Sequence, residues 1–328
     1  MNITKQEVVD KILQDAPLAL VDTAEAFAPS NIALCKYWGK RNLELNLPLT
    51  SSLSISLGKL GSRCRLSLCE ERDRVILNGR ELPPDSSFVI RLTQYLDLFR
   101  TDGRFYCVDT VNTIPTAAGF ASSASGFASL VKALNQLHGW QLEESKLSIL
   151  ARLGSGSAGR SLWQGFVEWH VGSRDDGMDS FAEPLPNSEW PEFRIGLLVL
   201  ESGKKEIGSR EAMQRTVETS ALYRSWPDKV AADIKTIKDA VMTKEFSLLG
   251  AAAESNALAM HATMMAAQPP VLYWLPQSVE VIKKVWQCRK EGMELYFTMD
   301  AGPNVKLLYL KKDQPEIKKI FPTLLTAE

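Results

Sequence analysis

The amino-acid sequence predicts a mixed fold of α-helices and β-strands, in one large domain or two of ordinary size. The length of 328 residues allows either division. Hydrophobic residues make up 45% of the chain, which is enough to bury a core. Their spacing alternates between the period of strands and the period of helices. A polar stretch rich in Gly, Pro and Asp, between Gly172 and Pro191, is the best candidate for a crossover between domains.

The first part of the chain is expected to be rich in strands. Thr4 to Glu7 has the spacing of a capping box and starts a short helix. A helix is also predicted over residues 87–100, whose apolar side chains crowd one broad face. Asn78-Gly79 is a hairpin signal. Strands are predicted over residues 18–28, 31–38, 53–57, 63–69, 74–77 and 105–111, with a turn over 46–52.

The rest of the chain is expected to contain more helices. Two of them precede the crossover, over residues 127–136 and 141–153, and a strand follows over 165–170. After the crossover, helices are predicted over residues 211–224, 228–242, 245–265 and 279–291. Strands are predicted there over residues 193–200, 294–299 and 306–310.

Composition excludes several classes of function. The 38 basic and 39 acidic residues nearly cancel, which argues against a nucleic-acid partner. No apolar run approaches the ~20 residues of a membrane span. Five cysteines without a CxxC spacing indicate reduced thiols and a cytoplasmic protein. Each of the three histidines is isolated in the sequence, so a zinc site or a triad based on histidine is not expected.

A run of small residues from Pro115 to Ser129 precedes a predicted helix and suits a polyphosphate. Gly119 permits unusual backbone angles, and the small side chains let an anion approach the main chain. The helix would direct unpaired amides at that anion, and Ser122, Ser123 and Ser125 would add hydroxyl donors. The run lacks the Lys-Ser/Thr pair of the P-loop. The alternative is a loop whose small residues only allow close packing of the helix on a sheet.

Charged residues at the ends of predicted strands suggest further anion sites. Lys36 lies within an apolar strand, where a buried lysine requires an acidic partner or a ligand. Arg160 closes a Gly- and Ser-rich run from Gly154, which suits a carboxylate or phosphate but also a flexible connector. Asp300 ends a strand before a glycine turn. That place suits a catalytic carboxylate and equally a turn-forming aspartate.

Five blocks of the sequence, in order, resemble the diphosphomevalonate decarboxylases of the GHMP kinase superfamily. They extend from residue 29 to residue 304 and are far more specific together than any one of them. The blocks are NIALCKYWGKR (31–41), LNLPLTSSL (45–53), PTAAGFASS (115–123), GSGSAGRS (154–161) and DAGPN (300–304).

The resemblance implies an α+β fold of two domains, with ATP and substrate in the cleft between them. The N-terminal domain, residues 1–185, would be ribosomal S5 domain 2-like and would bind ATP and substrate. The C-terminal decarboxylase domain, residues 186–328, would be ferredoxin-like. The implied reaction uses ATP to phosphorylate the 3-hydroxyl of mevalonate 5-diphosphate. Phosphate and CO2 then leave together, giving isopentenyl diphosphate in the mevalonate pathway.

The resemblance also assigns roles to residues of this chain. Asp300 would orient or deprotonate the hydroxyl, Lys36 would lie near it, and Arg160 would hold the substrate carboxylate. Other positions match those that hold the substrate: Tyr37, Trp38, Gly39, Lys40, Arg72, Ser155, Gly156, Ser157, Ala158, Gly159, Ser209 and Arg210. The ATP phosphate loop would comprise Pro115, Thr116, Ala117, Ala118, Gly119, Ala121, Ser122 and Ser123. Magnesium is expected with the nucleotide, and the family suggests a homodimer.

Three alternatives remain open at the level of the sequence. A relative that phosphorylates the 3-position without decarboxylation would lack part of the set formed by Asp300, Lys36 and Arg160, and all three are present. A decarboxylase of the 5-monophosphate would differ in the number of cations around the 5-position. A non-catalytic ligand sensor on the same fold is the remote alternative.

Overall fold

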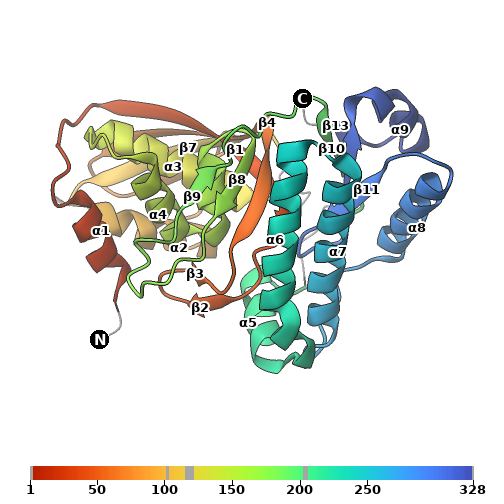
Figure 1. Cartoon of the computed structure of the whole chain (residues 1–328). Coiled ribbons are helices and arrows are strands. Elements are labelled where there is room, and N and C mark those ends of the chain that lie inside the picture. Colours follow the sequence, from red (N-terminus) through yellow and green to blue (C-terminus); the bar gives the residue numbers. More distant parts are fainter. Residues whose placement is uncertain (1–2, 101–102, 115–121, 202–205, 327–328) are drawn as a thin grey trace.

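The computed structural model describes residues 3–100, 103–114, 122–201 and 206–326. The chain forms an α+β structure of two domains that lie side by side (Figure 1). Within these described ranges, a seven-stranded sheet with four helices forms one domain, and a four-stranded sheet with five helices forms the other. The predicted α+β class is therefore confirmed.

Two long strands dominate the N-terminal sheet. β1 (Thr23–Cys35) pairs antiparallel with β4 (Ser52–Cys69), and both extend from this domain towards its neighbour. The sheet order is β6-β5-β7-β4-β8-β9, with β1 added to β4. The remaining strands are β5 (Arg74–Leu77), β6 (Arg80–Glu81), β7 (Phe105–Asn112), β8 (Phe166–Trp169) and β9 (Ala182–Pro184). A separate ribbon pairs β2 (Lys40–Asn42) with β3 (Leu47–Pro48).

Helices cover one face of this sheet and bury its core. Leu66 and Val108 of the sheet belong to one apolar cluster with Leu134 and Leu150 of the helices. The helices are α1 (Lys5–Leu13), α2 (Ser87–Leu96), α3 (Ser122–His138) and α4 (Glu144–Gly154), with 3₁₀ turns η1 (Asp97–Phe99) and η3 (Gly156–Leu162). The turn η3 follows α4 directly and carries Arg160.

The second sheet has the order β11-β12-β10-β13. Its strands are β10 (Phe193–Leu198), β11 (Tyr296–Met299), β12 (Val305–Leu310) and β13 (Leu325–Thr326). The helices of this domain are α5 (Ser209–Thr219), α6 (Trp226–Thr243), α7 (Phe246–Met265), α8 (Pro276–Lys290) and α9 (Gln314–Ile320), with η4 (Ala221–Ser225) and η5 (Lys311–Asp313).

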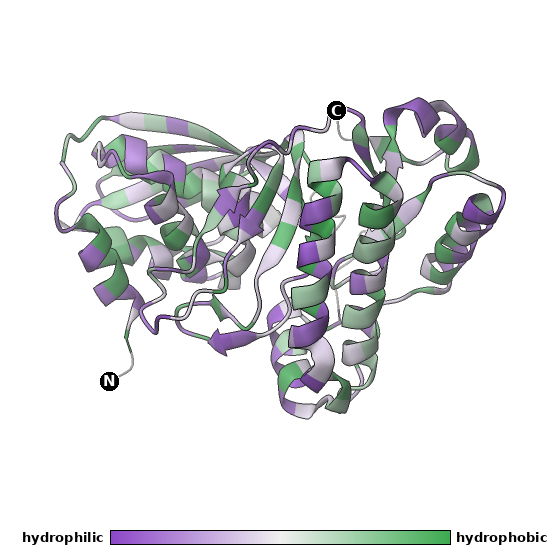
Figure 2. Ribbon diagram, viewed as in Figure 1, coloured by the Kyte–Doolittle hydropathy of each residue, from purple (hydrophilic) through white to green (hydrophobic). Residues whose placement is uncertain are grey.

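One apolar cluster joins the two domains. It contains Ile32 and Leu53 from the N-terminal sheet together with Trp226 and Leu249 from the helices of the other domain. Figure 2 shows how two neighbouring helices contribute to this cluster. α6 alternates between hydrophilic and hydrophobic residues, whereas α7 is apolar or neutral along most of its length. α7 lies between α6 and the four-stranded sheet, so more of the surface of α7 than of α6 is buried. This shared core fixes the ends of β1 and β4 against the second domain.

The structure corrects two predictions about the long strands. Residues 23–35 form one strand where two were expected, and residues 18–22 lie outside it. Pro29, which cannot donate to the sheet, coincides with a register shift in β1. Residues 52–69 also form one strand, which passes Gly61 close to the carbonyl of Ala28. A β-carbon at Gly61 would lie 2.1 Å from that carbonyl oxygen, so the glycine permits the crossing.

Local predictions with a defined hydrogen-bond pattern are confirmed. Thr4 Oγ1 accepts from the amide of Glu7, and Glu7 accepts from the amide of Thr4, which completes the capping box of α1. Asn78 and Gly79 both have positive φ and connect β5 to β6 as a hairpin. α3 begins at Ser122, five residues before its predicted start at Phe127.

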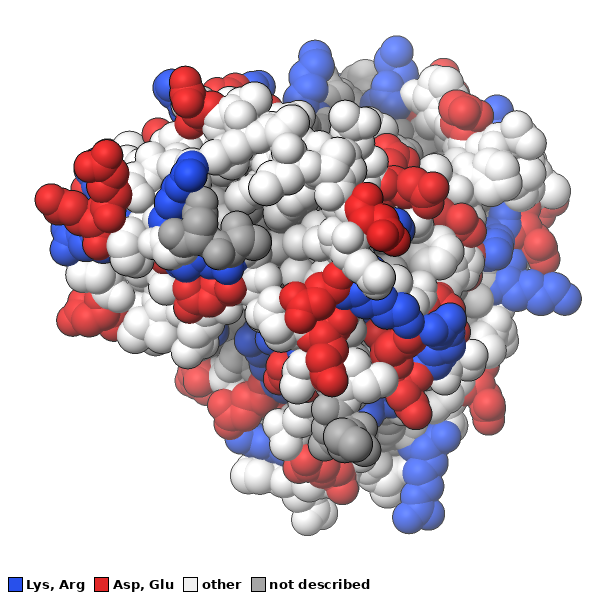
Figure 3. Space-filling view, turned by 90° about the vertical axis from the view of Figure 1, so that its left-hand side faces the viewer, with Lys and Arg blue, Asp and Glu red and all other residues white. Residues whose placement is uncertain are grey.

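The face of the molecule in Figure 3 shows no continuous field of one charge. On the face in Figure 3, Lys and Arg side chains lie among Asp and Glu side chains. Within the described residues, no helix has the length and apolar character needed to cross a membrane.

Candidate active site

A cavity of about 620 Å³ lies between the two domains and collects most of the predicted site residues. It is bounded by the end of β1, the 3₁₀ turn η3, the start of α3, the start of α5 and the segment after β11. The predicted residues that line it are Lys36, Tyr37, Trp38, Lys40, Ser123, Ser155, Gly156, Ser157, Arg160, Ser209, Arg210 and Asp300. A hollow of about 850 Å³ between β4 and α9 contains none of them.

Asp300 is held between two buried lysines. Its Oδ1 accepts from Lys36 Nζ at 2.9 Å, and its Oδ2 lies 3.1 Å from Lys306 Nζ. The carboxylate side chain is 32% exposed and faces the cavity, whereas both lysines are only 2% exposed. Burial by itself would raise the pKa of Asp300, but Lys306 and Lys36 outweigh it and hold the pKa well below its usual range. The carboxylate is therefore an anion at neutral pH.

Lys36 follows β1 directly, where its strand ends against the second domain. Its Nζ donates to the carbonyl of Ala33 at 2.6 Å as well as to Asp300. Burial lowers the pKa of Lys36 to about 8, although Asp300 favours the charged form. The expectation that a lysine in this apolar segment has an acidic partner is confirmed.

A buried histidine supports the backbone at Asp300. His261 Nε2 lies 3.1 Å from the carbonyl oxygen of Asp300. Because a carbonyl only accepts, Nε2 must carry the proton. Burial, followed by the charge of Lys36, lowers the pKa of His261 to about 3, so the ring is neutral. A neutral ring donates this hydrogen bond without adding a third cation beside Asp300.

A polar chain from α6 and α7 holds the backbone of Lys36. Asn256 Oδ1 accepts from the Lys36 amide at 2.8 Å, and Asn256 Nδ2 donates to Asp233 Oδ2 at 2.8 Å. Asp233 in turn accepts from Lys229 at 2.6 Å. Asn256 is fully buried, so its amide can take only the orientation that these partners dictate. The chain thus ties the end of β1 to the helices of the second domain.

Arg160 presents part of its guanidinium to the cavity. It is buried in η3, where Nη1 donates to Ser52 Oγ and Nε lies 3.4 Å from Asn31 Oδ1. Among the described residues, its Nη2 has no hydrogen-bond partner and no carboxylate lies within ion-pair distance. Burial lowers the pKa of Arg160 to about 10, which Asp300 partly offsets. A buried, charged fork with an open nitrogen suits a ligand carboxylate.

Tyr37 and Gly156 form a close contact at the wall of the cavity. A β-carbon at Gly156 would lie 2.7 Å from the hydroxyl oxygen of Tyr37, so only glycine leaves room for this ring. The Tyr37 ring packs against Trp169 with centroids 4.8 Å apart. Its hydroxyl is buried and has no hydrogen-bond partner within the described part of the chain. A buried hydroxyl without a partner is costly, which indicates that a ligand completes it.

The segment after Tyr37 is fixed by a tyrosine from the second domain. Tyr223, in η4, donates to the carbonyl of Trp38 at 2.7 Å. Gly39 has φ +117°, and a β-carbon there would lie 1.8 Å from the Tyr223 hydroxyl oxygen. Glycine at position 39 thus allows both the positive φ and the close approach of Tyr223. The next residue, Lys40, lines the cavity.

The other end of the cavity contains cations that have no acidic partner among the described residues. Lys40 Nζ donates to Asn46 Oδ1 at 2.6 Å, and Arg210 Nη2 lies 3.3 Å from the carbonyl of Gly154. Burial, together with the charges of Arg210 and Lys5, lowers the pKa of Lys40 to about 8. Ser209, the first residue of α5, also lines this end.

Several predicted residues lie away from the cavity wall. Ala158 and Gly159 are buried behind it, and Gly39 acts through the backbone. Arg72 lies on the exposed turn after β4, with Nη2 3.8 Å from a carboxylate oxygen of Glu81. The predicted ATP loop from Pro115 through Thr116, Ala117, Ala118, Gly119 and Ala121 lies outside the described residues, as does the side chain of Ser122.

One predicted hydroxyl donor of the phosphate loop has another role. Ser125 is buried in α3, where its Oγ lies 3.0 Å from Ser30 Oγ and 2.7 Å from Ser62 Oγ. It ties α3 to β1 and β4, so the prediction that it faces an anion was wrong. Ser123 is exposed at the start of α3 and lines the cavity.

Sequence reasoning missed Lys306, His261 and Asn256. Lys306 carried a usable signal, because it lies within the apolar strand β12 just as Lys36 follows the apolar β1. His261 and Asn256 lie on α7, whose apolar and small residues surround them on most sides. No spacing in the sequence relates either residue to Asp300 or Lys36.

The described residues do not form a cage for a metal ion. They contain no group of three or more His, Cys, Asp and Glu residues placed to hold one. Asp300 is the one carboxylate among the residues lining the cavity, and both its oxygens face lysines. Magnesium often retains waters and binds through substrate phosphates with few protein ligands. The donor set here fits an ion that arrives with a nucleotide.

Comparisons with known proteins agree over both domains. The family model of the diphosphomevalonate decarboxylase-like N-terminal domain matches residues 28–182. The family model of the mevalonate 5-diphosphate decarboxylase C-terminal domain matches residues 195–328. A diphosphomevalonate decarboxylase of Aspergillus fumigatus is 36% identical over 326 residues, covering 92% of this chain and 80% of that protein.

Solved structures are similar over nearly the whole chain. Mevalonate diphosphate decarboxylase from Staphylococcus aureus has a TM-score of 0.87 at 36% identity, covering 93% of this chain and 95% of that one. MDDEF in complex with MVAPP, AMPPCP and magnesium has a TM-score of 0.86 at 40% identity, covering 93% and 96%. The two-domain arrangement is thus shared with these proteins.

Proposed function

Because the chain belongs to the diphosphomevalonate decarboxylase family, we propose that it catalyses the ATP-dependent decarboxylation of mevalonate 5-diphosphate to isopentenyl diphosphate. ADP, phosphate and CO2 are the other products, and the reaction belongs to the mevalonate pathway. One observation carries the proposal: Asp300, Lys36 and Arg160, far apart in the sequence, line one cavity. ATP supplies the phosphoryl group that turns a tertiary hydroxyl into a good leaving group.

Asp300 orients the 3-hydroxyl of the substrate. A carboxylate with a strongly depressed pKa is a weak base, because general bases work best with a pKa near the operating pH. It remains a strong hydrogen-bond acceptor. Phosphoryl transfer through a loose transition state depends mainly on positioning and charge neutralisation. The two lysines keep the carboxylate charged and fixed, which favours orientation of the hydroxyl over full removal of its proton.

Arg160 and Lys36 hold the substrate carboxylate. Elimination breaks the bond between the carboxylate carbon and C2, and its electron pair forms the double bond between C2 and C3 as the bond between C3 and the leaving oxygen breaks. The two breaking bonds must therefore stay aligned. A planar guanidinium defines that orientation better than a point charge, and Arg160 lines the cavity. Lys36 places a second positive charge near the bond that breaks.

The remaining predicted residues bind the ends of the two substrates. Tyr37, Lys40, Ser209 and Arg210 hold the 5-diphosphate, which supplies the partner that the Tyr37 hydroxyl lacks among the described residues. We keep Trp38, Gly39, Arg72 and the stretch 155–159 as substrate positions. The stretch 115–123 binds the phosphates of ATP, and magnesium accompanies the nucleotide. Magnesium would neutralise phosphate charge there.

Three broader features belong to the same proposal. We place the division between the domains at residues 185 and 186, a boundary supported by the start of β10 at Phe193. A homodimer follows from the family resemblance, and light scattering would separate it from a monomer of 36.4 kDa. Five free cysteines support a cytoplasmic location, which imaging of the tagged protein in its own cell would test.

A turnover assay tests the activity. Purified protein is incubated with ATP, magnesium and either mevalonate 5-diphosphate or mevalonate 5-phosphate, and ADP, phosphate and CO2 are measured. The proposal predicts CO2 release with the diphosphate. ADP formation without CO2 would indicate a kinase, preference for the monophosphate would indicate the other decarboxylase, and no turnover with either would indicate a ligand sensor.

A further inference from the structure

The cavity is lined by two more cations than the sequence assigned. Besides Lys40 and Arg210, they are Lys5 of α1, whose charge acts on Lys40, and Arg91 of α2. We refer to Lys5, Lys40, Arg91 and Arg210 as the outer cations. Within the described residues, none of the four lies within 4.0 Å of a carboxylate. Four positive charges lining one cavity without a carboxylate partner attract an anion of high charge.

The side chains of Lys5 and Arg91 are available for a ligand. Lys5 makes no hydrogen bond or ion pair with any described residue. Arg91 donates Nε to the carbonyl of Ser87 at 3.0 Å, and its two terminal nitrogens have no partner among the described residues. Lys5 is also the first residue of α1, where the helix dipole disfavours a cation. The helix does not stabilise a cation at that position, and a bound anion would offset the repulsion.

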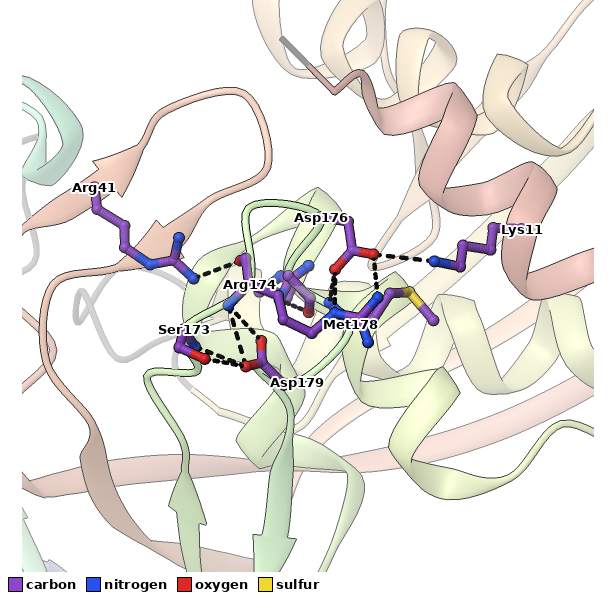
Figure 4. A network of polar contacts seen from close by, with 9 residues as sticks. Lys11, Arg41, Ser173, Arg174, Asp176, Met178 and Asp179 are labelled. Atoms are coloured by element: carbon purple, nitrogen blue, oxygen red, sulfur yellow. Dashed lines mark hydrogen bonds and ion pairs between the residues drawn. The ribbon is translucent and has the colours of Figure 1, made fainter. Parts of the chain in front are cut away.

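A polar network fixes α1 relative to the strand that carries Lys40. Lys11 of α1 donates to Asp176 at 3.0 Å, and Arg174 binds the same carboxylate through two nitrogens. Arg41, next to Lys40 in β2, donates to the carbonyl of Arg174 at 2.9 Å. Figure 4 shows Lys11 and Arg41 reaching the 173–179 loop from opposite sides.

The inside of the same loop is also fixed. Asp179 accepts from the amides of Ser173 and Arg174, and Met178 donates to Asp176 at 3.1 Å. α1 itself packs into the core through Val8, Val9 and Ile12, which are almost fully buried. Lys5 is therefore carried by an element held at both its apolar face and its polar end. This arrangement preorganises the positive charge instead of leaving it on a free terminus.

We propose that Lys5 and Arg91 are specificity-determining residues that bind the terminal phosphate of the 5-diphosphate. This inference rests on the proposed function and identifies what recognises the second phosphate. Lys40 and Arg210 are already assigned to the diphosphate, and Lys5 acts electrostatically on Lys40. The N-terminal family match begins at residue 28, so Lys5 lies ahead of the matched segment.

Equilibrium binding tests this proposal without turnover. The wild-type protein, Lys5→Ala, Arg91→Ala and the double variant are titrated calorimetrically with mevalonate 5-diphosphate and with mevalonate 5-phosphate, in the absence of ATP. Each single variant should lose roughly tenfold in affinity for the diphosphate, since a charge-assisted contact is removed. The loss for the monophosphate should stay below about twofold, because that ligand has no terminal phosphate. Lys235→Ala, which removes an exposed lysine of α6 outside the cavity, is the matched control and should change neither affinity.

Three results would overturn the proposal. Equal falls in affinity for both ligands would assign the cations to general attraction. A fall in affinity for a non-hydrolysable ATP analogue instead would assign them to the nucleotide. Affinities that remain at the wild-type values would show that neither cation binds the ligand. A wild-type protein that binds neither mevalonate ligand would contradict the proposed function and this inference together, whereas normal wild-type binding with an unchanged ratio would contradict this inference alone.

Discussion

The two ends of the interdomain cavity differ in how their charges are balanced. At the inner end, Asp300 lies between Lys36 and Lys306, and buried hydrogen bonds fix each group. At the outer end, the four outer cations have no carboxylate within ion-pair distance among the described residues. The inner end is preorganised for a reaction at one carbon, whereas the outer end is charged for binding. Substitutions at the inner end should therefore affect kcat, and those at the outer end KM.

Removal of the inner carboxylate should have the largest effect. Asp300→Ala should lower kcat by about 1,000-fold or more, because the hydroxyl loses its orienting acceptor. Nucleotide binding should be retained. The change also leaves two buried lysines without their counter-ion, so a thermal melt and the milder Asp300→Asn should be measured in parallel. Normal turnover by either variant would exclude Asp300 from the chemistry.

Replacement of the planar cation should have the next largest effect. Arg160→Lys should lower the rate of CO2 release by about 100-fold, because an ammonium group cannot hold a carboxylate in one plane. ADP formation should fall less, so its time course should run ahead of that of CO2 in quenched-flow samples. The matched change Arg65→Lys, on the exposed face of β4, should alter neither rate. Equal losses of ADP and CO2 would contradict a specific role in elimination.

Loss of the backbone support behind Lys36 should have an intermediate effect. Asn256→Ala removes the acceptor for the Lys36 amide and should reduce kcat by about tenfold, since small displacements of catalytic groups are costly. KM for ATP should stay near the wild-type value. Thr263→Ala, which removes a buried hydroxyl of the same helix that bonds to the Met260 carbonyl, is the control. If both variants lose activity in proportion to stability, Asn256 has no positioning role.

Titration of Lys40 at the outer end should change the dependence of kcat/KM on pH. The pKa of Lys40 is lowered to about 8, so the lysine is charged below that pH and loses its proton above it. The value of kcat/KM, which reports on the free enzyme, should therefore fall above about pH 8. In Lys40→Arg the charge at position 40 persists, so the fall should become shallower, and the part that remains is assigned to Lys36, whose pKa is also lowered to about 8. Superimposable profiles would show that another group controls this limb.

The smallest effect is expected from a residue that only holds α1 in place and does not line the cavity. Lys11→Ala breaks the ion pair of α1 with Asp176, and the lysine side chain is 53% exposed. Exposed ion pairs contribute about 0–1 kcal/mol, so KM for mevalonate 5-diphosphate should rise by no more than about fivefold. Steady-state kinetics would measure it, with kcat unchanged. A large fall in kcat would contradict the separation of the two ends.

Site residues could be predicted from the sequence where a charged residue lies in or beside an apolar strand. Lys36 lies in an apolar segment and therefore required an acidic partner or a ligand, and the structure shows that this partner is Asp300, which was predicted only from its place at the end of a strand. Lys306 carried the same signal and was overlooked. His261 and Asn256 could not be predicted, because they act on the backbone of distant residues and only the packing of α7 brings them there.

Strand continuity and the outer cations depended on long-range contacts. Pro29 and Gly61 indicate local breaks, yet the pairing of β1 with β4 continues past both. Lys5 begins an ordinary amphipathic helix, and only the docking of α1 brings it to the cavity. Local patterns thus located the helices and the reacting groups, whereas the extent of the cavity followed from tertiary packing.

An isotope experiment tests most directly whether the 3-hydroxyl at the inner end is phosphorylated and then leaves as phosphate. Mevalonate 5-diphosphate carrying ¹⁸O in its 3-hydroxyl is converted in one turnover with ATP and magnesium, and the inorganic phosphate is analysed by mass spectrometry. Phosphorylation of that hydroxyl followed by elimination predicts one ¹⁸O atom in each released phosphate. Unlabelled phosphate, with CO2 still released, would contradict the account.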